Sequence, residues 1–516
     1  MAFYARARRQ KHASIHDPAV RPLRLAVLKA AGINLVVLQV LFLGLFCYLF
    51  GSLFQQTTHV HNLNVVFVDY DGGAIGAAVR TAYQQLRGPG FPTLTEHPVT
   101  AYPEPEIITS AVCGIDYWGG LYTSPNASNQ LAAALGGGTP HNASDILTLV
   151  WNEARYSTVV DSAIASSMET LADAARTAYT QTLNLSLAPT TATTLTTLTT
   201  PWTLSTINIQ PTTQGSRLVY NTLVIILIMI QEFFYLGYIN TVYQQFHLYT
   251  AVAPHRIALI RQLLAGTYTM LGSLCTAGAV WAFKYGWQVS GAQFVLTWLA
   301  LWLFAHVNFL VLDVFTVWIP APFVPMALIS WIVLNTTSIL LPFELAPAFY
   351  RWAYALPAHA VFQVLVDIWS AGCNPMLAYA LPVLFGFQVV GLGLSTLGVY
   401  RRAHYAVIAR EVDERGCREK VAAAVLAEKQ ERADRGTGEG VEDEDEEEHA
   451  SGSASMRAMG SGLREERDRG HVATAAGQEE REGRMMGQLV REMSQVERTA
   501  TRKQNPGPCF DLPYTE

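Results

Sequence analysis

Charged residues are scarce in this chain. Asp, Glu, Lys and Arg together make up 15 % of its 516 residues, whereas hydrophobic residues make up 50 %. This composition argues against an ordinary cytosolic protein, because such proteins carry more charge on their surface. The net charge of −6 reflects the segment from Arg401 onward, which is rich in charged residues. The stretch from Gly32 to Tyr400 consists largely of long uncharged apolar runs.

The common catalytic and nucleotide-binding motifs are also missing. There is no G-x-x-x-x-G-K-[ST] loop, so ATP cannot bind through a P-loop, and ATP-driven transport would need a separate ATPase subunit. His-Glu-x-x-His, Cys-x-x-Cys and Gly-x-Ser-x-Gly do not occur, and the 13 His residues show no metal-ligand spacing. We therefore predict no catalytic residue, no metal and no cofactor, and a protein that is not an enzyme.

Six apolar segments are long enough to cross a bilayer, which takes about 20 residues. The first is too long for a cleaved signal peptide and lacks a cleavage site, so it reads as an uncleaved signal anchor. The fold class that we expect is therefore a polytopic α-helical membrane protein with six transmembrane helices. They run from Ile33 to Phe54, Leu218 to Tyr238, Ile260 to Phe283, Ala292 to Val314, Phe323 to Leu341 and Tyr379 to Tyr400.

Basic residues in the connections predict the orientation. They precede the first span (Arg6, Arg8, Arg9, Lys11, Arg21, Arg24, Lys29), lie before the third span (His255, Arg256, Arg261) and follow the last (Arg401, Arg402, Arg410). Both termini are therefore expected in the cytoplasm, with the first arm on anionic lipid rather than on nucleic acid. The predicted organisation is a basic arm (1–30), a first helix (31–54), an extracytoplasmic domain (55–215), a five-helix domain (216–402) with an outer loop (342–376), and a cytoplasmic tail (403–516).

Three glycosylation sequons agree with this orientation. Asn126, Asn142 and Asn184 each begin an Asn-x-Ser sequence in the outer segment, whereas Asn335 lies within the fifth predicted span and should be unreachable. Of the six cysteines, only Cys113 and Cys373 lie outside. Two alternatives remain open, a disulfide between them or a buried free thiol at Cys113.

Short strands alternate with helices in the outer segment, which predicts an α/β domain. Strands are expected at Leu63–Asp69, Gly114–Tyr122 and Ile146–Trp151, and helices at Gly76–Leu86, Ala127–Leu135 and Ser166–Leu183. The Thr-rich stretch from Pro189 to Thr213 has no apolar periodicity and is predicted to be a stalk. The run Asp71-Gly-Gly-Ala-Ile-Gly76 lacks the glycine spacing of a dinucleotide-binding loop, so we interpret it as a tight turn between strand and helix.

Several motifs resemble a known family. They include Val68-Asp-Tyr-Asp-Gly-Gly-Ala-Ile-Gly76, Ile115-Asp-Tyr-Trp-Gly-Gly-Leu-Tyr122, Val150-Trp-Asn-Glu-Ala-Arg155 and Leu341-Pro-Phe-Glu-Leu-Ala-Pro347. In these motifs the chain resembles the fungal nitrosoguanidine-resistance membrane proteins, a family built on a domain of unknown function, over roughly Ala30 to Arg402. The positions that carry the resemblance include Asp69, Asp71, Gly72, Gly73, Gly76, Asp116, Trp118, Gly119, Pro125, Asn152, Glu153 and Pro357.

The resemblance implies an architecture similar to that of ABC-2-type permeases, with one span, an outer domain and five more spans. It implies export of toxic compounds, resistance to them, or lipid redistribution at the plasma membrane, the alternative being another membrane of the secretory pathway. It also implies short re-entrant helices in the outer loop before the last span. The aromatic residues there (Phe349, Tyr350, Trp352, Tyr354, Phe362, Trp369) suit helices at the membrane interface.

Polar residues inside the spans are the candidate translocation path, because a polar group in hydrocarbon is costly unless it faces protein or water. The candidates are Asn221, Glu232, His306 and Asp313. The alternative is that these groups only form hydrogen bonds between helices. Glu232, the one acidic residue well inside a span, is either a protonatable gate or a structural acid.

The tail is expected to be helical from His404 to about Asp434 and then mostly disordered, because its charged composition cannot bury enough apolar surface. The lipid bilayer is the expected partner, and a homodimer and a separate ATPase subunit remain open. Two competing functions also remain open at this point. One is a non-transporting scaffold or assembly factor whose outer domain binds a partner, and the other is a membrane enzyme acting on lipids.

Overall fold

The computed structural model describes residues 18, 21–136, 142–182, 192–212, 223–284 and 286–438. The chain forms two compact units. The first unit comprises residues 1–233, 263–315 and 322–393, and the second comprises residues 234–262, 316–321 and 394–516. The first unit holds the whole sheet and the segments that pack against it.

A five-stranded sheet, with strand order β2-β1-β3-β4-β5, organises the part of the chain after the first helix. Strand β1 pairs in parallel with β2 and β3, β3 and β4 are antiparallel, and β4 and β5 are parallel. The strands are β1 (Asn64–Asp69), β2 (Thr93–His97), β3 (Gly119–Thr123), β4 (Leu147–Trp151) and β5 (Leu204–Asn208). The accompanying helical segments are η2 (Gln56–Asn62), α3 (Ala74–Leu86), α4 (Pro105–Cys113), α5 (Ala127–Leu135), η3 (Ala143–Asp145), η4 (Glu153–Arg155), α6 (Ser157–Val160), η5 (Asp161–Ala165), α7 (Ser166–Thr182) and α8 (Ala192–Thr199).

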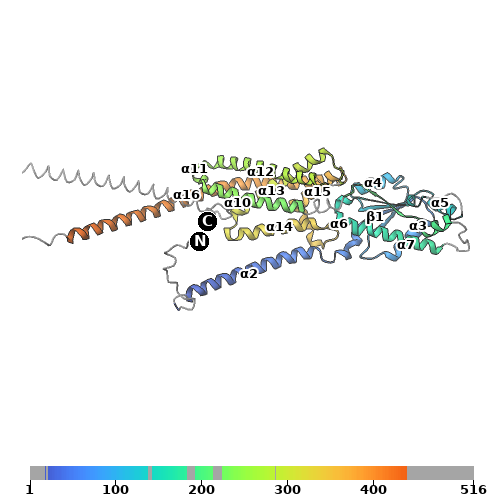
Figure 1. Ribbon diagram of the computed structural model, residues 1–516, viewed down its shortest axis with the longest axis horizontal. Helices are drawn as coiled ribbons and strands as arrows, with labels where there is room; N and C mark the ends of the chain where they lie inside the picture. Colours follow the sequence, from blue (N-terminus) through green and yellow to red (C-terminus); the bar gives the residue numbers. More distant parts are fainter. Residues whose placement is uncertain are drawn as a thin grey trace, which may run out of the picture. The chain divides into compact units, whose positions relative to one another are not determined.

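Strand β1 is buried on both faces, which explains its continuous apolar run. Val65 and Phe67 belong to the large core that also contains buried residues of α3 and α7. Val66 and Val68 point to the opposite face, where they pack with Ile108 of α4. Figure 1 shows α4 on one side of β1, with α3 and α7 on the other. Helices thus cover both faces of the sheet.

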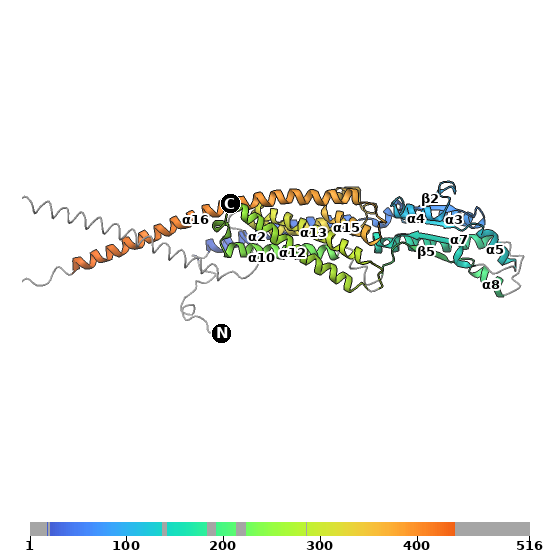
Figure 2. The same cartoon turned by 90° about the horizontal axis from the view of Figure 1, so that it is seen from above.

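The Thr-rich segment is part of this domain, so the prediction that Pro189 to Thr213 forms only a stalk is wrong. Strand β5 lies within it and pairs with β4 over its whole length, from Leu204 opposite Leu147 to Asn208 opposite Trp151. Strand β5 therefore forms one edge of the sheet and β2 the other, as Figure 2 shows. Edge strands tolerate exposed Thr and Ser, which hides their apolar pattern in the sequence.

The strand predicted from Gly114 to Tyr122 is also corrected. Its first residues follow the end of α4 at Cys113, and only Gly119–Thr123 forms a strand. Gly120 explains the close packing here, because a Cβ at this residue would lie 2.2 Å from Cγ2 of Ile108. Helix α4 thus packs directly on β3.

The remaining described chain is almost entirely helical. Its elements are α2 (Arg21–Ser52), α10 (Val224–Gln245), α11 (Leu248–Ala251), α12 (Pro254–Ala282), α13 (Gly291–Trp318), η7 (Ala321–Phe323), α14 (Val324–Leu340), η8 (Ala348–Ala355), α15 (Pro357–Trp369) and α16 (Leu377–Gly438). Five of them contain stretches long and apolar enough to cross a membrane, namely α2, α10, α12, α13 and α16. Helix α14, the fifth predicted span, is apolar but has only 17 residues. These helices indicate a helical, membrane-embedded protein with about five candidate spans.

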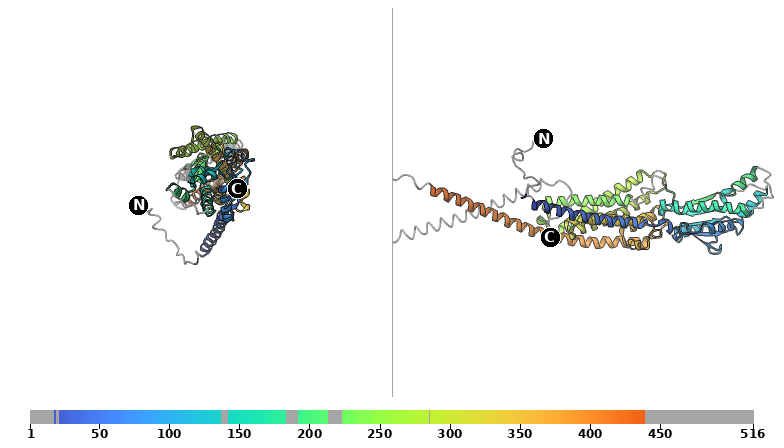
Figure 3. Two further views of the ribbon diagram at one scale, coloured as in Figure 1. Left: turned by 90° about the vertical axis from the view of Figure 1, so that its right-hand side faces the viewer. Right: turned by 90° about the horizontal axis from the view of Figure 1, so that it is seen from below.

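Helix α2 packs against α14, and the two are visible as the blue and yellow helices in Figure 3. Near the end of α2, the Tyr350 hydroxyl donates a hydrogen bond of 2.8 Å to the Tyr48 carbonyl oxygen. Gly51 allows this approach, since a Cβ there would lie 2.5 Å from the Tyr350 hydroxyl oxygen. The first helix is thereby anchored to the segment that follows α14.

That segment contains two short helices, η8 and α15, as the resemblance implies, but its aromatic residues are not all at the surface. Phe349 and Trp352 of η8 are exposed, as expected, but Phe362 and Trp369 of α15 are almost completely buried. Helix α15 lies in the same core as the sheet domain. This segment, residues 341–376, is therefore packed between the sheet and the apolar helices, and we call it the connector.

The charged tail begins as an uninterrupted continuation of the last predicted span. Helix α16 runs from Leu377 to Gly438 and includes the stretch predicted to be helical from His404 to about Asp434. The prediction of disorder concerns residues 439–516, which lie outside the described residues. Most of the basic arm, apart from residue 18 and the start of α2, also lies outside them.

Candidate functional site

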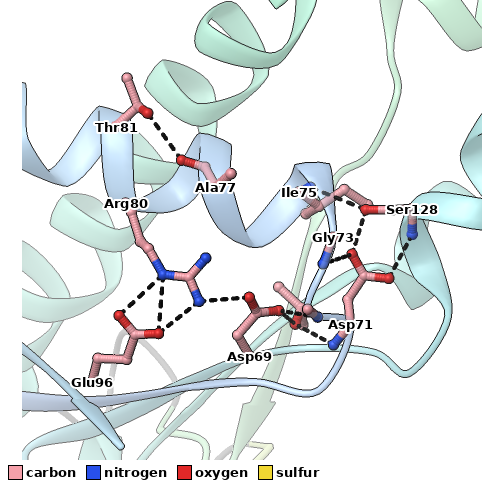
Figure 4. A network of polar contacts seen from close by, with 11 residues as sticks. Asp69, Asp71, Gly73, Ile75, Ala77, Arg80, Thr81, Glu96 and Ser128 are labelled. Atoms are coloured by element: carbon pink, nitrogen blue, oxygen red, sulfur yellow. Dashed lines mark hydrogen bonds and ion pairs between the residues drawn. The ribbon is translucent and has the colours of Figure 1, made fainter.

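The Asp71-Gly-Gly run forms the tight turn that the sequence indicates. The Asp71 carboxylate accepts hydrogen bonds from the Gly73 amide (3.1 Å) and from the amide (2.8 Å) and hydroxyl of Ser128 in α5. The Ser128 hydroxyl oxygen also accepts a bond of 3.1 Å from the Ile75 amide at the start of α3. Gly72 has a φ of +63°, which glycine adopts without strain. Figure 4 shows that these hydrogen bonds of the Asp71 carboxylate and of Ser128 join the turn to α5.

Asp69 completes this network at the end of β1. Its carboxylate accepts hydrogen bonds from the Thr123 hydroxyl (2.7 Å) and the Gly72 amide (3.0 Å), and it forms an ion pair of 2.7 Å with Arg80. Gly76 is required here because a Cβ would lie 1.9 Å from an Asp69 carboxylate oxygen. These motif positions therefore fix the β1–α3 turn rather than present a ligand site.

Asn152 and Glu153 hold a second junction, at the end of β4. The Glu153 carboxylate accepts hydrogen bonds from the Asn208 side chain (2.6 Å) and the Thr212 amide (3.0 Å), which fastens the end of β5. The Asn152 side-chain amide donates a bond of 3.2 Å to the carbonyl oxygen of Cys373. Asn152 thus connects the sheet to the connector after α15.

A disulfide joins the same two parts, linking Cys113 at the end of α4 to Cys373. The bond spans 260 residues of sequence. Of the two alternatives that the sequence leaves open for Cys113, the structure contains the bridge and not the free thiol. Asn152 and this bridge therefore both attach the sheet domain to Cys373, and the next residue, Asn374, lines a cavity.

The cavity has a volume of about 330 Å³ and lies between the sheet domain and the connector, within one compact unit. Asn62, Asn64 and Asp116 are exposed at its mouth, whereas Tyr156, His359 and Asn374 are buried. Polar groups and aromatic rings both line it. The lining residues are Asn62, Asn64, Ile115, Asp116, Trp118, Arg155, Tyr156, Pro342, Phe343, Glu344, Tyr354, His359, Gln363, Asn374 and Met376.

Arg155 supplies the positive charge of the cavity. Its guanidinium lies 3.9 Å from the centre of the Trp118 ring and donates a hydrogen bond of 3.2 Å to the Tyr117 carbonyl oxygen. Burial lowers the pKa of Arg155 to about 10, and the Glu344 carboxylate acts in the opposite direction. The side chain therefore stays protonated at neutral pH. Within the described parts of the chain, Arg155 forms no ion pair with a carboxylate.

A chain of neutral side chains forms the buried side of the cavity. His359 Nδ1 lies 2.9 Å from the Ser338 carbonyl oxygen, which can only accept, so Nδ1 carries the proton. His359 Nε2 is then free to accept from the Gln363 amide at 3.3 Å, and the Gln363 side-chain oxygen accepts from Asn374 at 2.9 Å. Burial lowers the pKa of His359 to about 4. This histidine is therefore neutral at physiological pH.

The start of α15 is fixed by a neighbouring helix. Pro357 occupies the first turn of α15, where its missing N–H costs nothing. The Asn335 side-chain oxygen of α14 accepts a hydrogen bond of 3.2 Å from the Ala358 amide. His359 and Gln363 consequently hold fixed positions at the cavity.

Of the candidate translocation residues that the structure describes, Glu232 and Asp313 are buried and His306 is half-buried. Glu232 of α10 is 0 % exposed, and Asp313 of α13 is equally buried. His306 of α13 contacts Gln388 of α16, with 2.7 Å between Nδ1 and Nε2. Within the described helices no hydrogen bond or ion pair joins Glu232 to His306. Asn221 lies outside the described residues.

Of the sequons, Asn126 and Asn142 are both exposed, and Asn184 lies outside the described residues. Pro125 is exposed directly before Asn126, at the start of α5. Gly119 is packed within β3, where a Cβ would lie 3.1 Å from Ile164. These positions are structural or superficial and do not line the cavity.

The sequence alone predicts Asp116 and Trp118 only as family motif positions, and it does not predict Arg155, Glu344, His359, Gln363 or Asn374 as site residues. The available signal is a charged residue at the end of a motif that begins with a buried strand, such as Arg155 in Val150-Trp-Asn-Glu-Ala-Arg155. Such a residue has to be paired or face a polar cavity when it is enclosed. Which residues meet it cannot be read from spacing, because they come from segments far apart in the chain.

No solved structure matches this chain. A family model described as "Protein of unknown function (DUF3533)" matches residues 34–393. The match covers well over half of the chain, including the sheet domain, the connector and the start of α16. The chain is therefore a member of the DUF3533 family.

Proposed function

We propose that this protein is a membrane transport protein that exports toxic compounds, or redistributes lipids, at the plasma membrane. Its architecture is similar to that of ABC-2-type permeases, with six crossings, of which α14, the fifth, is the shortest. Both termini are cytoplasmic, and the sheet domain lies on the opposite side of the membrane. The arrangement follows from the resemblance of the sequence and from the distribution of basic residues.

The observation that carries this proposal is the environment of Glu232. The side chain lies inside the apolar helix α10 and is 0 % exposed. Neither carboxyl oxygen has a hydrogen-bond partner among the described residues. An ionised carboxylate without a partner would cost several kcal/mol in such a place. Glu232 is therefore a group that binds a proton or a passing cation, and such groups within membrane helices mark transport pathways.

The neighbouring helix packs tightly beside this group. A Cβ on Gly272 of α12 would lie 2.1 Å from Nε2 of Gln231, so α10 and α12 approach closely next to Glu232. Tyr268 of α12 is an electrostatic neighbour of the carboxyl group. Small movements of α12 against α10 would change the surroundings of Glu232. The side chain is thus suited to act as a protonatable gate.

The decisive test distinguishes a role of Glu232 in proton exchange from a purely structural role. A Glu232→Gln variant keeps the shape and hydrogen-bonding capacity of the side chain but cannot exchange a proton. We expect normal surface expression with loss of resistance to toxic compounds in cells, and loss of movement of fluorescent amphiphiles and lipids in vesicles. Glu169→Gln, at an exposed position of α7, is the matched control and should behave like the unmodified protein.

A purely structural role makes different predictions. Glu232→Gln would then be silent across a range of external pH, whereas Glu232→Leu, which removes the polar group, would lower expression. Vesicles containing the full chain are assayed with and without a co-purified ATPase. A scaffold moves nothing under either condition, and a lipid enzyme changes the lipids instead of moving them. Either result would replace the transport proposal.

A further inference from the structure

The cavity between the sheet domain and the connector contains a guanidinium that forms no ion pair with a described residue. Arg155 keeps its positive charge, and its contacts with Trp118 and the Tyr117 carbonyl leave other guanidinium N–H groups toward the cavity. A buried or half-buried guanidinium normally binds a carboxylate or a phosphate. Arg155 forms no ion pair with a carboxylate of the described residues. We therefore expect its partner to be an anionic group on a ligand.

The carboxylates of the cavity occupy a different position. Glu344 is half-buried and Asp116 is exposed at the mouth. Glu344 influences Arg155 electrostatically without forming an ion pair with it. Positive and negative charges are therefore both present but held apart. Separated charges of this kind complement a ligand that carries both signs.

Size limits the ligand further. A cavity of about 330 Å³ is at the lower end of the range of about 300 to 1,000 Å³ that is usual for small-molecule sites. The chain His359–Gln363–Asn374 is internally hydrogen-bonded and neutral, so it restricts the cavity without adding charge. Long acyl chains and peptides of several residues exceed this volume. A molecule of a few to about a dozen non-hydrogen atoms would.

We propose that this cavity binds a small zwitterion, with its anionic group at Arg155 and its cationic group near Glu344 and Asp116. The rings of Trp118, Tyr156 and Tyr354 would cover the part between the two charges. The proposal concerns binding alone and holds whether or not the protein moves the ligand. Loss of transport and loss of binding can therefore be told apart.

The test uses the full-length, oxidised protein in lipid nanodiscs and isothermal titration calorimetry. The probes are three ω-amino acids of increasing charge separation: glycine, 4-aminobutyrate and 6-aminohexanoate. Each is compared with the carboxylate and the amine of the same chain length. We expect at least one zwitterion to bind about tenfold more tightly than both of its singly charged analogues, because each charge then meets its opposite. The absence of such a preference in all three series would overturn the proposal.

Variants of Arg155 and Glu344 test which residue binds each charged end of the zwitterion. Arg155→Met should lower the affinity for the zwitterion to that for the amine of the same chain length. Glu344→Gln should lower it to that for the carboxylate of the same chain length. Glu169→Gln, an exposed carboxylate on α7, serves as the matched control with unchanged affinity. If Arg155→Met does not fold, the selectivity of the unmodified protein and the effect of Glu344→Gln still show whether the cavity binds a zwitterion. Equal losses for zwitterion and carboxylate analogue in Glu344→Gln would contradict the assignment of the cationic end.

Discussion

The side-chain amide of Asn152 donates a hydrogen bond of 3.2 Å to the carbonyl oxygen of Cys373, across 221 residues of sequence. Asn152 is 1 % exposed, and its side-chain oxygen also accepts from the Ala154 amide. Two backbone groups would lose their partner in an Asn152→Ala variant. We expect the free energy of unfolding to fall by about 1–3 kcal/mol, measured by denaturant titration of the detergent-solubilised protein. Asn129→Ala removes an exposed amide of α5 and should change it by less than about 0.5 kcal/mol.

The disulfide predicts a non-additive pattern of substitutions. Cys113→Ser and Cys373→Ser each remove the same bond, so the double variant should be no less stable than either single variant. The expected loss is about 2–4 kcal/mol, with Cys275→Ser, an exposed free cysteine, as the matched control. Mass spectrometry of non-reduced peptides checks the pairing directly. Recovery of Cys113 and Cys373 as free thiols from protein purified without reductant would contradict the bridge.

The β1–α3 turn predicts a large effect from one methyl group. In Gly76→Ala the added Cβ would lie 1.9 Å from an Asp69 oxygen, and Asp69 cannot move away without breaking its bonds to Arg80 and Thr123. A destabilisation of about 1–3 kcal/mol is expected, visible as a lower melting temperature. Gly88→Ala meets no atom closer than 4.0 Å and should be near neutral. Similar melting temperatures for the two variants would show that the turn relaxes.

The sequence predicts those parts of the fold in which one segment determines its own structure. The strand β1 and the helix α3 are visible because an apolar run ends at Asp69 and a glycine turn follows. By contrast, β5 (Leu204–Asn208) carries Ser, Thr and Asn, and only its pairing with β4 makes it a strand. Its formation depends on a tertiary contact that no local pattern contains.

The candidate sites divide in the same way. Glu232 can be found from the sequence, since an acidic residue within an apolar span is costly wherever its neighbours are. The cavity residues cannot, because Arg155 belongs to the sheet domain and Glu344 to the connector. Their proximity depends on how the sheet packs on α15, and that packing is fixed by contacts such as Asn152 with Cys373. The prediction that Phe362 suits the membrane interface fails for the same reason, since this packing buries its side chain.

The two exposed sequons predict unequal glycosylation. The Asn142 side-chain nitrogen donates a bond of 2.8 Å to Asp145, whereas only the side-chain oxygen of Asn126 is engaged, by Asn129. If the sheet domain faces the secretory lumen, Asn126 should therefore carry a glycan in a larger fraction of molecules. Endoglycosidase treatment should shift the gel mobility more in Asn142→Gln than in Asn126→Gln. No shift in the unmodified protein, together with an N-terminal tag accessible from outside, would refute the proposed orientation.

His359 predicts how stability depends on pH. Its ring is buried against Phe343 and Tyr354, and burial lowers its pKa to about 4, compared with about 6.5 in an unfolded chain. Above pH 6.5 the ring is neutral in both states, so its contribution to stability is fully present. Between pH 6.5 and 4 the unfolded chain binds a proton that the folded protein does not, and stability falls as the pH is lowered. The total loss below both pKa values is about 3 kcal/mol, of which about 2 kcal/mol is reached at pH 5.

The measurement compares unfolding of the unmodified protein and of His359→Gln at pH 7.5, 6.0 and 5.0. Gln can still donate to the Ser338 carbonyl oxygen but cannot titrate, so its stability should decline less steeply with falling pH. Any constant loss from the changed packing against the rings cancels, because only the slope is compared. Since Glu344 lines the same cavity, the comparison is repeated in a Glu344→Gln background. Parallel slopes in both backgrounds would mean that His359 binds a proton equally well in the folded protein.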